Sequence, residues 1–314
     1  MKQAAIVALT GATAVGKTDV ALALADLLPI DIVSMDSAMV YRGLDIGSAK
    51  PSKDTLARYP HALVDIRDPL HPYSAADFLR DADQAVQSSL AAGRIPLLVG
   101  GTMLYLKAFR DGLAELPGAD PEIRAEIQRQ AERVGWPNLH ERLSRLDPVA
   151  ASGIHPNNAA RIERALEVCE LTGRPLSELW KAAEDRDVRA RHGVALREFC
   201  VMPDSRAALH ERIAERVDGM LAAGLVAEVQ RLYDRGDLHP DLPAIRAVGY
   251  RQVWAHLEGE IAAAELSERI AIATRQLARR QLTWLRGWAI QSMMWDDSQS
   301  LAAGLIDSLR LENS

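Results

Sequence analysis

The residues best suited to chemistry lie near the amino terminus, in the segment Gly11-Ala12-Thr13-Ala14-Val15-Gly16-Lys17-Thr18. This segment fits the pattern G-x-x-x-x-G-K-[ST], in which the glycines let successive backbone N–H groups point at phosphate oxygens. Lys17 would add a positive charge, and Thr18 would add a hydroxyl that can bind Mg²⁺. The sequence therefore predicts a loop that binds a diphosphate or a triphosphate, and the pattern does not say which.

The segments on either side of this loop predict how it is held. An apolar run at residues 4–9 predicts a strand before the loop, and residues 17–28 predict a helix after it, ending at Pro29. Further strands are expected at residues 30–34, 62–66, 95–99 and 196–202, with a helix at residues 74–92. Strands that alternate with helices predict an α/β fold, a P-loop-type and mostly parallel sheet flanked by helices.

The strand pattern disappears over residues 116–194. Asp120 and Pro121 form a helix start signal before residues 122–134, and a further helix is expected over residues 158–171. We therefore expect an all-helical insertion domain at residues 116–194, within a catalytic core made of residues 1–115 and 195–314. Later helices are expected at residues 206–222, 225–235 and 266–288, and residues 300–314 should form a peripheral helix or tail.

Two polar groups follow expected strands directly. Asp36 comes after the strand at residues 30–34, and Thr102 comes after the strand at residues 95–99. Ligands collect at the carboxyl edge of a parallel sheet, and a carboxylate there can act as the base for a nucleophile. Asp36 could instead cap a helix or bind magnesium, and the residues alone leave these alternatives open. The strand ending in Gly100-Gly101 lacks the acidic residue with which ATP-hydrolysing proteins of this class usually hold magnesium.

The composition excludes several classes of protein. A net charge of −6 argues against a general nucleic-acid-coating protein, although residues 269–295 contain five arginines and no acidic residue. No run of eighteen apolar residues occurs, so we expect a soluble protein without a membrane-spanning helix. Cys169 and Cys200 are too few for a disulfide framework, which favours the cytoplasm. Trp284 and Trp288, four residues apart, are expected to lie in the core.

Five ordered motifs, which together span nearly the whole chain, resemble those of the bacterial tRNA dimethylallyltransferase (tRNA isopentenyltransferase) family. They are the loop at residues 11–18, Asp36-Ser37-Ala38-Met39-Val40-Tyr41-Arg42, Asp45-Ile46-Gly47-Ser48-Ala49-Lys50-Pro51, Gly100-Gly101-Thr102-Met103-Leu104-Tyr105 and Ala247-Val248-Gly249-Tyr250-Arg251-Gln252. The resemblance implies transfer of a dimethylallyl group from dimethylallyl diphosphate to N6 of adenine 37, next to the tRNA anticodon. Diphosphate would be the leaving group, held by the loop.

The resemblance also implies roles for single residues. Asp36 would take the proton of the adenine amine, and Thr102 would orient the reacting region. Arg216 would bind the diphosphate together with Lys17 and Mg²⁺, because fixed cations stabilise the charge that develops as the allylic C–O bond breaks. Without the resemblance, Arg212 and Arg216 could equally belong to a solvated helix face with neighbouring glutamates.

The adenine must leave the stacked anticodon loop to react, so the family resemblance also implies residues that face RNA. These implied tRNA contacts are Asp36, Ser37, Ala38, Met39, Thr102, Arg124, Ala160, Arg161, Ile162, Glu163, Arg164, Asp241, Leu242, Pro243, Ala244, Ile245, Arg246, Arg275, Arg279 and Arg280. The expected partners are the anticodon stem-loop and dimethylallyl diphosphate. A monomer is expected, because the sequence contains no obvious heptad pattern.

Two other classes of function fit part of the pattern. One is a small-molecule P-loop kinase that uses ATP, with Asp36 as its base and the helical insertion as a lid. The other is a non-catalytic RNA-binding protein that uses nucleotide binding for control. Transfer of label from dimethylallyl diphosphate into tRNA without ATP would distinguish the transferase from both.

Overall fold

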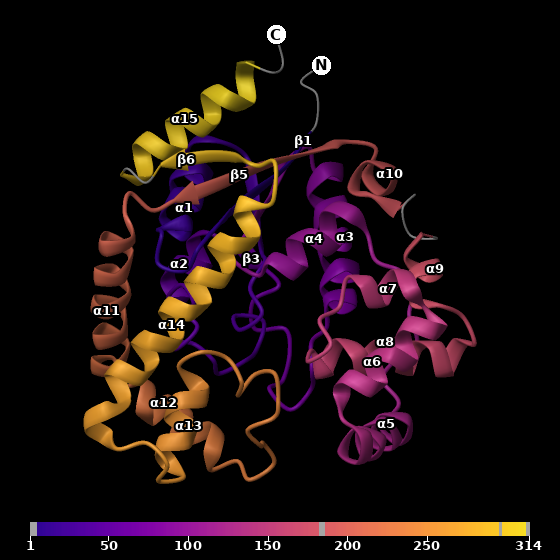
Figure 1. Cartoon of the computed structure of the whole chain (residues 1–314). Helices are drawn as coiled ribbons and strands as arrows, with labels where there is room; N and C mark the ends of the chain where they lie inside the picture. The colour runs from indigo at the N-terminus through magenta and orange to yellow at the C-terminus, as the bar shows by residue number, and fades with distance from the viewer. Residues whose placement is uncertain (1–4, 182–185, 295–296, 312–314) are drawn as a thin grey trace. The chain divides into compact units, whose positions relative to one another are not determined.

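The computed structural model describes residues 5–181, 186–294 and 297–311, and its centre is a parallel six-stranded sheet (Figure 1). The strands, in the order in which they lie in the sheet, are β3 (His61–Ala62), β2 (Ile30–Ser34), β4 (Ile95–Val99), β1 (Ala5–Gly11), β5 (Ala195–Met202) and β6 (Gln291–Met294). The expected parallel α/β fold is confirmed. Ala4, which the expected first strand included, lies outside the described residues.

β1 lies between two other strands and is almost completely buried. Val7 is opposite Leu97 of β4 on one side and Arg197 of β5 on the other. Helices cover the sheet: α1 (Lys17–Leu27) contacts β1, β2 and β4, and α3 (Ala75–Ala91) contacts β2 and β4. Because the central strands are covered in this way, they form continuous apolar runs rather than alternating patterns.

Two strands differ from expectation. The strand expected at residues 62–66 is only the two-residue β3, because Leu63 and Asp65 have φ values of +64° and +57°, which break an extended chain. β6 was not expected at all, and it pairs with β5 at the edge of the sheet. It leads to α15 (Ser298–Leu311), which packs on α1; residues 312–314 of the expected tail lie outside the described residues.

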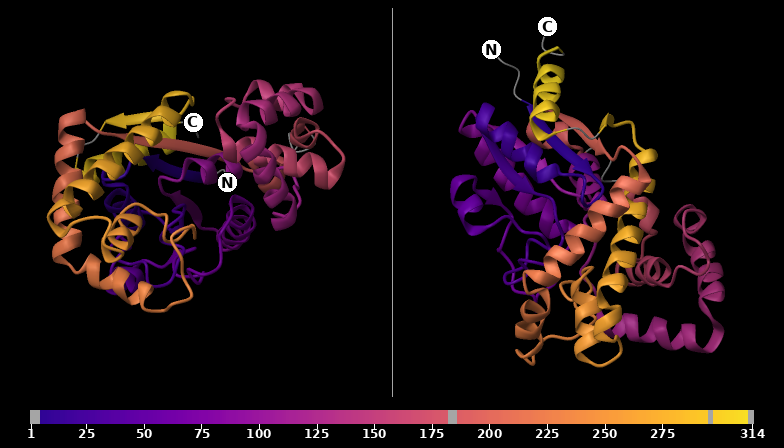
Figure 2. Two further views of the ribbon diagram at one scale, coloured as in Figure 1. Left: turned by 60° about the horizontal axis from the view of Figure 1, so that its bottom comes forward. Right: turned by 90° about the vertical axis from the view of Figure 1, so that its left-hand side faces the viewer.

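The carboxy-terminal third contains two long helices that run side by side, α11 (Arg206–Ala222) and α14 (Ala263–Arg286) (Figure 2). Between them in the chain come α12 (Leu225–Tyr233) and α13 (Tyr250–Leu257). α14 also contacts β1, so one face of this helix lies against the strand that carries the phosphate-loop sequence. Shorter helices elsewhere in the chain are α2 (Lys53–Arg58), α4 (Met103–Asp111) and α10 (Val188–His192).

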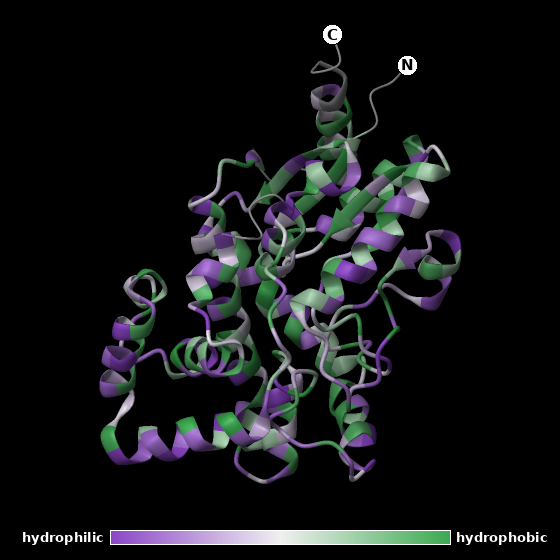
Figure 3. Cartoon of the chain, turned by 90° about the vertical axis from the view of Figure 1, so that its right-hand side faces the viewer, coloured by the Kyte–Doolittle hydropathy of each residue, from purple (hydrophilic) through white to green (hydrophobic). Residues whose placement is uncertain are grey.

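A second compact unit covers Asp111–Arg191, and its described residues contain helices and no strand. Its main helices are α5 (Pro121–Val134), α6 (Trp136–Leu146), α7 (Pro148–Ser152), α8 (Ala159–Thr172) and α9 (Leu176–Lys181). Hydrophobic and hydrophilic residues alternate along the helices (Figure 3), as amphipathic helices require. The apolar faces build a separate core around Ile127, Leu143 and Leu166. Residues 182–185 lie outside the described part of this unit.

None of the described helices combines the length and the apolar character that a membrane span requires.

Candidate active site

The phosphate loop connects the end of β1 to the start of α1. Gly11 has φ +151°, and a Cβ atom there would lie 2.6 Å from the carbonyl oxygen of Val201, so only glycine fits. Gly16 has φ +77° and is the N-cap of α1. The first N–H groups of a helix have no intrahelical partner, and the helix dipole is positive at this end. The loop therefore offers a site for an anion.

Lys17 folds back over this loop. Its Nζ donates hydrogen bonds to the carbonyl oxygens of Gly11, at 3.1 Å, and Ala12, at 2.6 Å. Burial, and then the positive charge of Arg216, lower the pKa of Lys17 to about 8, while the negative charge of Asp36 acts in the opposite direction. The lysine, the arginine and the aspartate thus interact electrostatically within one site.

Asp36 follows β2 and closes a turn with one of its carboxylate oxygens. Its Oδ1 accepts hydrogen bonds from the backbone N–H groups of Ala38, at 2.8 Å, and Met39, at 3.2 Å. The sequence left open a capping role for Asp36, and the structure shows that it caps this turn. The carboxylate also interacts with Arg216, because its charge raises the pKa of the guanidinium that burial lowers.

Thr102 follows β4 and binds the neighbouring loop. Its Oγ1 accepts a hydrogen bond from the backbone N–H of Ser37 at 3.1 Å, and its own N–H donates to the carbonyl oxygen of Met35 at 3.4 Å. Because β2, β4 and β1 are neighbours in the sheet, Asp36, Thr102 and the phosphate loop follow the carboxyl ends of three adjacent strands. This edge is where ligands bind in parallel α/β sheets.

Arg216 and Arg212 lie one turn apart on α11 but have different partners. Arg216 interacts with Lys17 and Asp36, and burial lowers its pKa. Arg212 lies 3.4 Å from Asp204. Arg216 is therefore the arginine of this pair that can act on a ligand held by the phosphate loop.

Glu228 joins two of the sequence motifs, and the sequence analysis did not identify it. Its side chain is buried and accepts hydrogen bonds from the backbone N–H groups of Asp45, Ile46 and Gly47, at 3.1, 2.8 and 3.2 Å. It also accepts the hydroxyl hydrogen of Tyr250 at 2.6 Å. A Cβ on Gly47 would lie 2.6 Å from the Tyr250 ring, so the glycine lets these motifs meet. Both motifs thus have a structural function around one buried carboxylate.

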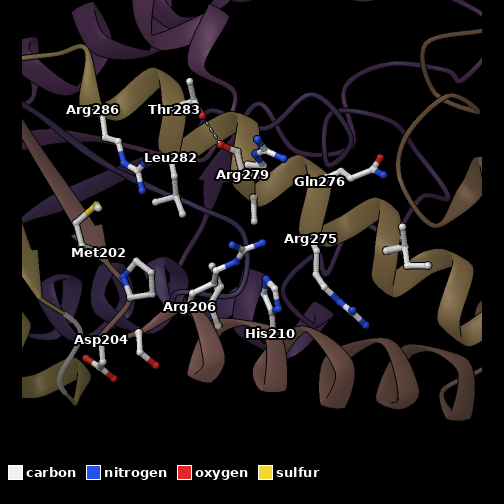
Figure 4. Close-up of a pocket in the computed structure, with 15 residues that line it drawn as sticks. Met202, Asp204, Arg206, His210, Arg275, Gln276, Arg279, Leu282, Thr283 and Arg286 are labelled. Carbon is white, nitrogen blue, oxygen red and sulfur yellow. Dashed lines mark hydrogen bonds between the residues drawn. The ribbon is translucent and has the colours of Figure 1, made fainter.

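An arginine-lined groove lies where β5 ends, between α11 and α14 (Figure 4). Its volume is about 790 Å³, and the residues that define it here as the arginine groove are Arg206, His210, Arg275, Arg279 and Arg286. Within the described part of the chain, none of the four arginines has a carboxylate partner. Burial lowers the pKa of His210, and the charges of Arg206 and Arg275 lower it further. Asp204, which lies 3.4 Å from Arg212, is the one carboxylate among the described residues that line the groove, so the four arginines give the groove a net positive charge.

Arg280, the third arginine predicted on this helix, lies beside the groove. Together with Gln276, Arg279, Thr283 and Trp284 it lines a second hollow of about 450 Å³. Trp284 and Trp288, which were expected in the core, are partly buried and pack against a cluster formed by Met103, Cys200 and Leu285. Burial raises the pKa of the Cys200 thiol to about 11, which keeps this thiol protonated at neutral pH.

Within the helical unit, the predicted RNA-facing residues differ in what they contact. Arg124 and Arg164 both bind Glu167, whose side chain is fully buried, with N···O distances of 2.8 and 2.6 Å. Ile162 belongs to the core of the unit, and Glu163 accepts a hydrogen bond from Gln128. The remaining two, Ala160 and Arg161, are exposed. The segment at residues 241–246 likewise alternates, with buried Leu242, Ala244 and Ile245 between exposed Asp241, Pro243 and Arg246.

Sequence reasoning did not connect Gln281 of α14 with the phosphate loop, which its buried side chain contacts. A signal for it existed. Ala278, Gln281 and Leu285 are spaced as one face of a helix, and the first and last are apolar. A polar residue within a buried stripe needs hydrogen-bond partners. Arg206 carried no comparable signal, because a single arginine at the start of a helix is ordinary.

Comparison with known proteins agrees with this arrangement. A model of the family described as IPP transferase matches residues 39–288, and one described as isopentenyl transferase matches residues 4–73. The chain is 53% identical to tRNA dimethylallyltransferase 2 of Hahella chejuensis over 97% of its own length and 95% of that protein.

Solved structures show the same fold. The chain is similar to the full-length tRNA isopentenylpyrophosphate transferase of Bacillus halodurans, with a TM-score of 0.69 and 34% identity, covering 100% of this chain and 98% of the other. It is also similar in fold to a eukaryotic dimethylallyltransferase that acts on tRNA, with a TM-score of 0.81 and 23% identity over 99% of this chain and 80% of the other. With these matches and the grouping of the loop, Asp36 and Thr102 at one sheet edge, the chain belongs to the tRNA dimethylallyltransferase (IPP transferase) family.

Proposed function

We propose that this chain transfers the dimethylallyl group of dimethylallyl diphosphate to N6 of adenine 37 in tRNA and releases diphosphate. The observation that carries the proposal is that the phosphate loop, Asp36 and Thr102 follow the carboxyl ends of three adjacent strands, where the charges of Lys17, Arg216 and Asp36 also act on one another. This arrangement joins two cations that can bind a departing diphosphate to one carboxylate that can accept a proton. The cations would stabilise the diphosphate as the dimethylallyl group leaves it, and the carboxylate would accept the proton of the attacking amine.

The diphosphate is held by the phosphate loop, residues 11–18. The backbone N–H groups at the start of α1 and the ammonium group of Lys17 bind its oxygens, and Arg216 adds a second positive charge. Lys17 donates to two carbonyl oxygens of its own loop, and a phosphate oxygen would compete for the same ammonium hydrogens. Fixed cations act more strongly on the transition state than on the substrate, because negative charge grows on the leaving oxygen as the C–O bond breaks.

Mg²⁺ fits this site as a cation held mainly by the substrate. The protein contributes the hydroxyl of Thr18, which is half-buried in the first turn of α1. The described residues contain no group of three His, Cys, Asp or Glu side chains that could hold a metal. Mg²⁺ commonly keeps several waters and binds substrate phosphates with one or two protein ligands, so a single hydroxyl suffices. When bound, it would offset charge on the departing diphosphate.

Asp36 is the proposed general base. N6 of adenine becomes a better nucleophile as its proton is removed, because its lone pair is otherwise delocalised into the ring. The N6 lone pair forms the new N–C bond, the allylic C–O bond breaks toward diphosphate, and the N6 proton goes to the Asp36 carboxylate. Oδ1 is held by the backbone of Ala38 and Met39, which fixes the carboxylate for this step. Thr102 follows the neighbouring strand and is hydrogen-bonded to Ser37; it would orient the adenine ring.

The tRNA is proposed to contact the arginine groove and the exposed residues of the predicted contact segments. Arginines without protein partners suit phosphate oxygens, which supply most of the affinity for nucleic acid. Arg275 and Arg286 are eleven residues apart on α14, which at 1.5 Å per residue is roughly 16 Å. That separation suits several nucleotides of one strand and exceeds what one diphosphate can span.

The helical unit is proposed as a further tRNA-binding domain, with Arg161 as the exposed arginine of the predicted contact segment at residues 160–164. Two free cysteines are consistent with the proposal that the enzyme works in the cytoplasm, and a monomer suffices because one chain supplies all the proposed groups.

The deciding experiment incubates the protein with Mg²⁺, labelled dimethylallyl diphosphate and unmodified tRNA, without ATP. We expect label in tRNA that carries adenine at position 37 and none in a matched tRNA with guanine there. A parallel incubation with labelled ATP and small acceptors tests the kinase alternative. Phosphate transfer in the second incubation, without label in tRNA in the first, would overturn the proposal.

A further inference from the structure

Gln281 connects two loops of the active site from a third element. The backbone N–H of Thr13, inside the phosphate loop, donates to Gln281 Oε1 at 2.8 Å. Gln281 Nε2 donates to the carbonyl oxygen of Gly101 at 2.8 Å. Each end of the amide therefore has a complementary partner. In the flipped orientation Nε2 would face the N–H of Thr13, donor against donor, and Oε1 would face the carbonyl oxygen of Gly101, acceptor against acceptor.

The two partners lie beyond the last strand hydrogen bonds between β1 and β4. The pairing of these strands ends at Leu9 and Val99, and the hydroxyl of Thr10 bonds to the carbonyl oxygen of Gly100. Farther along, no backbone hydrogen bond of the described sheet joins the phosphate loop to the loop that carries Thr102. Gln281 is the bridge at this level, because it binds both loops with one side chain.

The surroundings of Gln281 are built for this contact. Its side chain is buried, with 8% exposure. A Cβ on Gly101 would lie 2.5 Å from Nε2 of Gln281 and 3.3 Å from the carbonyl oxygen of Gly11. Gly101 thus lacks a side chain where the glutamine amide approaches its backbone. A buried amide with both ends satisfied holds its neighbours in one geometry, because any shift leaves polar groups unpaired.

We infer that Gln281 is a positioning residue for dimethylallyl transfer, setting the phosphate loop and the Thr102 loop at a fixed separation. This inference rests on the proposed function of the site. The diphosphate on one loop and the adenine oriented by the other must meet at the allylic carbon. A displacement of about 1 Å between reacting groups can slow a reaction about a hundredfold. Gln281 itself touches neither reacting group.

The test compares Gln281→Met with Gln299→Met, which makes the same change at an exposed position of α15. Methionine has a similar length and no hydrogen-bonding amide. We expect Gln281→Met to lower kcat by about tenfold to a hundredfold at saturating substrates, with an unchanged Kd for tRNA, while Gln299→Met matches the unaltered protein. Rates are given per folded site, counted by the stoichiometry of tRNA binding, so that loss of folded protein alone does not lower kcat.

Gly101→Ala breaks the same bridge from its other end, because the new methyl group would lie only 2.5 Å from Nε2 and push the amide away. It should lower kcat to a similar extent, and the double variant should be no slower than the slower single variant. A kcat for Gln281→Met within twofold of the unaltered protein, or effects of the two changes that multiply, would overturn the inference. If the unaltered protein transfers no dimethylallyl group, the proposed function fails and this inference fails with it.

Discussion

The hydroxyl of Tyr250 donates to Oε1 of Glu228 at 2.6 Å, at the centre of a buried cluster. Three backbone N–H groups, those of Asp45, Ile46 and Gly47, complete the set of donors to the same carboxylate. The carboxylate thus stabilises a loop that has no regular secondary structure of its own. Burial and the nearby Glu228 charge raise the pKa of Tyr250, so the phenol remains the donor.

Replacing Tyr250 by phenylalanine removes one donor to this carboxylate and keeps the ring against Gly47. We expect Tyr250→Phe to lower the free energy of unfolding by about 1.5 to 3 kcal/mol, the usual range for a hydrogen bond to a charged group. Glu228→Ala should cost more, because it leaves three backbone N–H groups unpaired. Urea unfolding followed by circular dichroism measures both changes.

Tyr233→Phe is the matched control, since Tyr233 is partly exposed and its ring packs on Trp254 through contacts that phenylalanine keeps. It should leave stability within about 0.5 kcal/mol of the unaltered protein. Equal effects of Tyr250→Phe and Tyr233→Phe would show that the hydrogen bond to Glu228 contributes no stability.

The sequence was sufficient for features that follow from local order along the chain. Residues 30–34 and 95–99 are the observed bounds of β2 and β4, because continuous apolar runs between turn signals are what buried parallel strands look like. Asp36 and Thr102 come directly after these strands, so a parallel sheet was bound to place them at one edge. The order of the strands then makes them neighbours.

Features that depend on contacts between distant segments could not be predicted. Gln281 and Thr13 are 268 positions apart, and Glu228 is 181 positions from Gly47. β6 pairs only with β5 at the edge of the sheet, and its sequence Gln291-Ser292-Met293-Met294 has no strong strand pattern. β3 is short because Leu63 and Asp65 have positive φ values, and the residue types Leu and Asp do not by themselves predict this conformation.

The lowered pKa of Lys17 predicts a pH dependence of diphosphate binding. In the free protein the pKa is about 8, so Lys17 begins to lose its positive charge as the pH rises through that value. A bound diphosphate favours the protonated lysine and therefore raises its pKa. Affinity should thus be highest below pH 8 and fall by up to about tenfold per pH unit above it. Calorimetric titration with diphosphate between pH 6.5 and 9.5 measures this, with proton uptake near pH 8.

Lys17→Arg separates this effect from titration of the diphosphate itself. Arginine stays charged throughout the range, so the variant should keep only the pH dependence that the ligand contributes. Identical pH profiles for the two proteins would show that Lys17 is not the group that titrates.

Asp36→Asn tests the proposed base while keeping the turn that Asp36 closes. Asparagine retains a side-chain oxygen for the N–H groups of Ala38 and Met39, so the loop should keep its shape. The amide cannot accept the N6 proton. We expect the rate of dimethylallyl transfer to fall about 10²- to 10⁴-fold, with binding of diphosphate and tRNA nearly unchanged. Single-turnover rates and direct binding measurements separate the two effects.

Asp54→Asn, at an exposed position in α2, is the control for the loss of one negative charge and should have normal rates. If Asp36→Asn instead abolishes binding of diphosphate while the loop remains folded, Asp36 acts as a ligand for magnesium or for the substrate rather than as a base.

The arginine groove predicts how tRNA binding depends on salt. Arg279 on α14 and Arg206 on α11 both line the groove, and neither has a carboxylate partner within the described residues. Each arginine that binds a phosphate releases counterions from the RNA, so the slope of log K against log salt reports the number of such contacts. Arg279→Ala and Arg206→Ala should each weaken binding and reduce the magnitude of the slope by roughly one unit.

Arg231→Ala provides the comparison, because Arg231 is exposed on α12 and does not line the groove. It should leave both affinity and slope unchanged. Filter binding of the anticodon stem-loop over 50–300 mM salt, about a sixfold range over which contacts of this kind lose much of their strength, distinguishes the three variants. Arg206 is the more informative position, since only the structure assigns it to the groove: an unchanged slope for Arg206→Ala beside a reduced slope for Arg279→Ala would limit the RNA contact to α14. Unchanged slopes for both would mean that the groove does not bind phosphate, and that its uncompensated arginines serve some ligand other than tRNA.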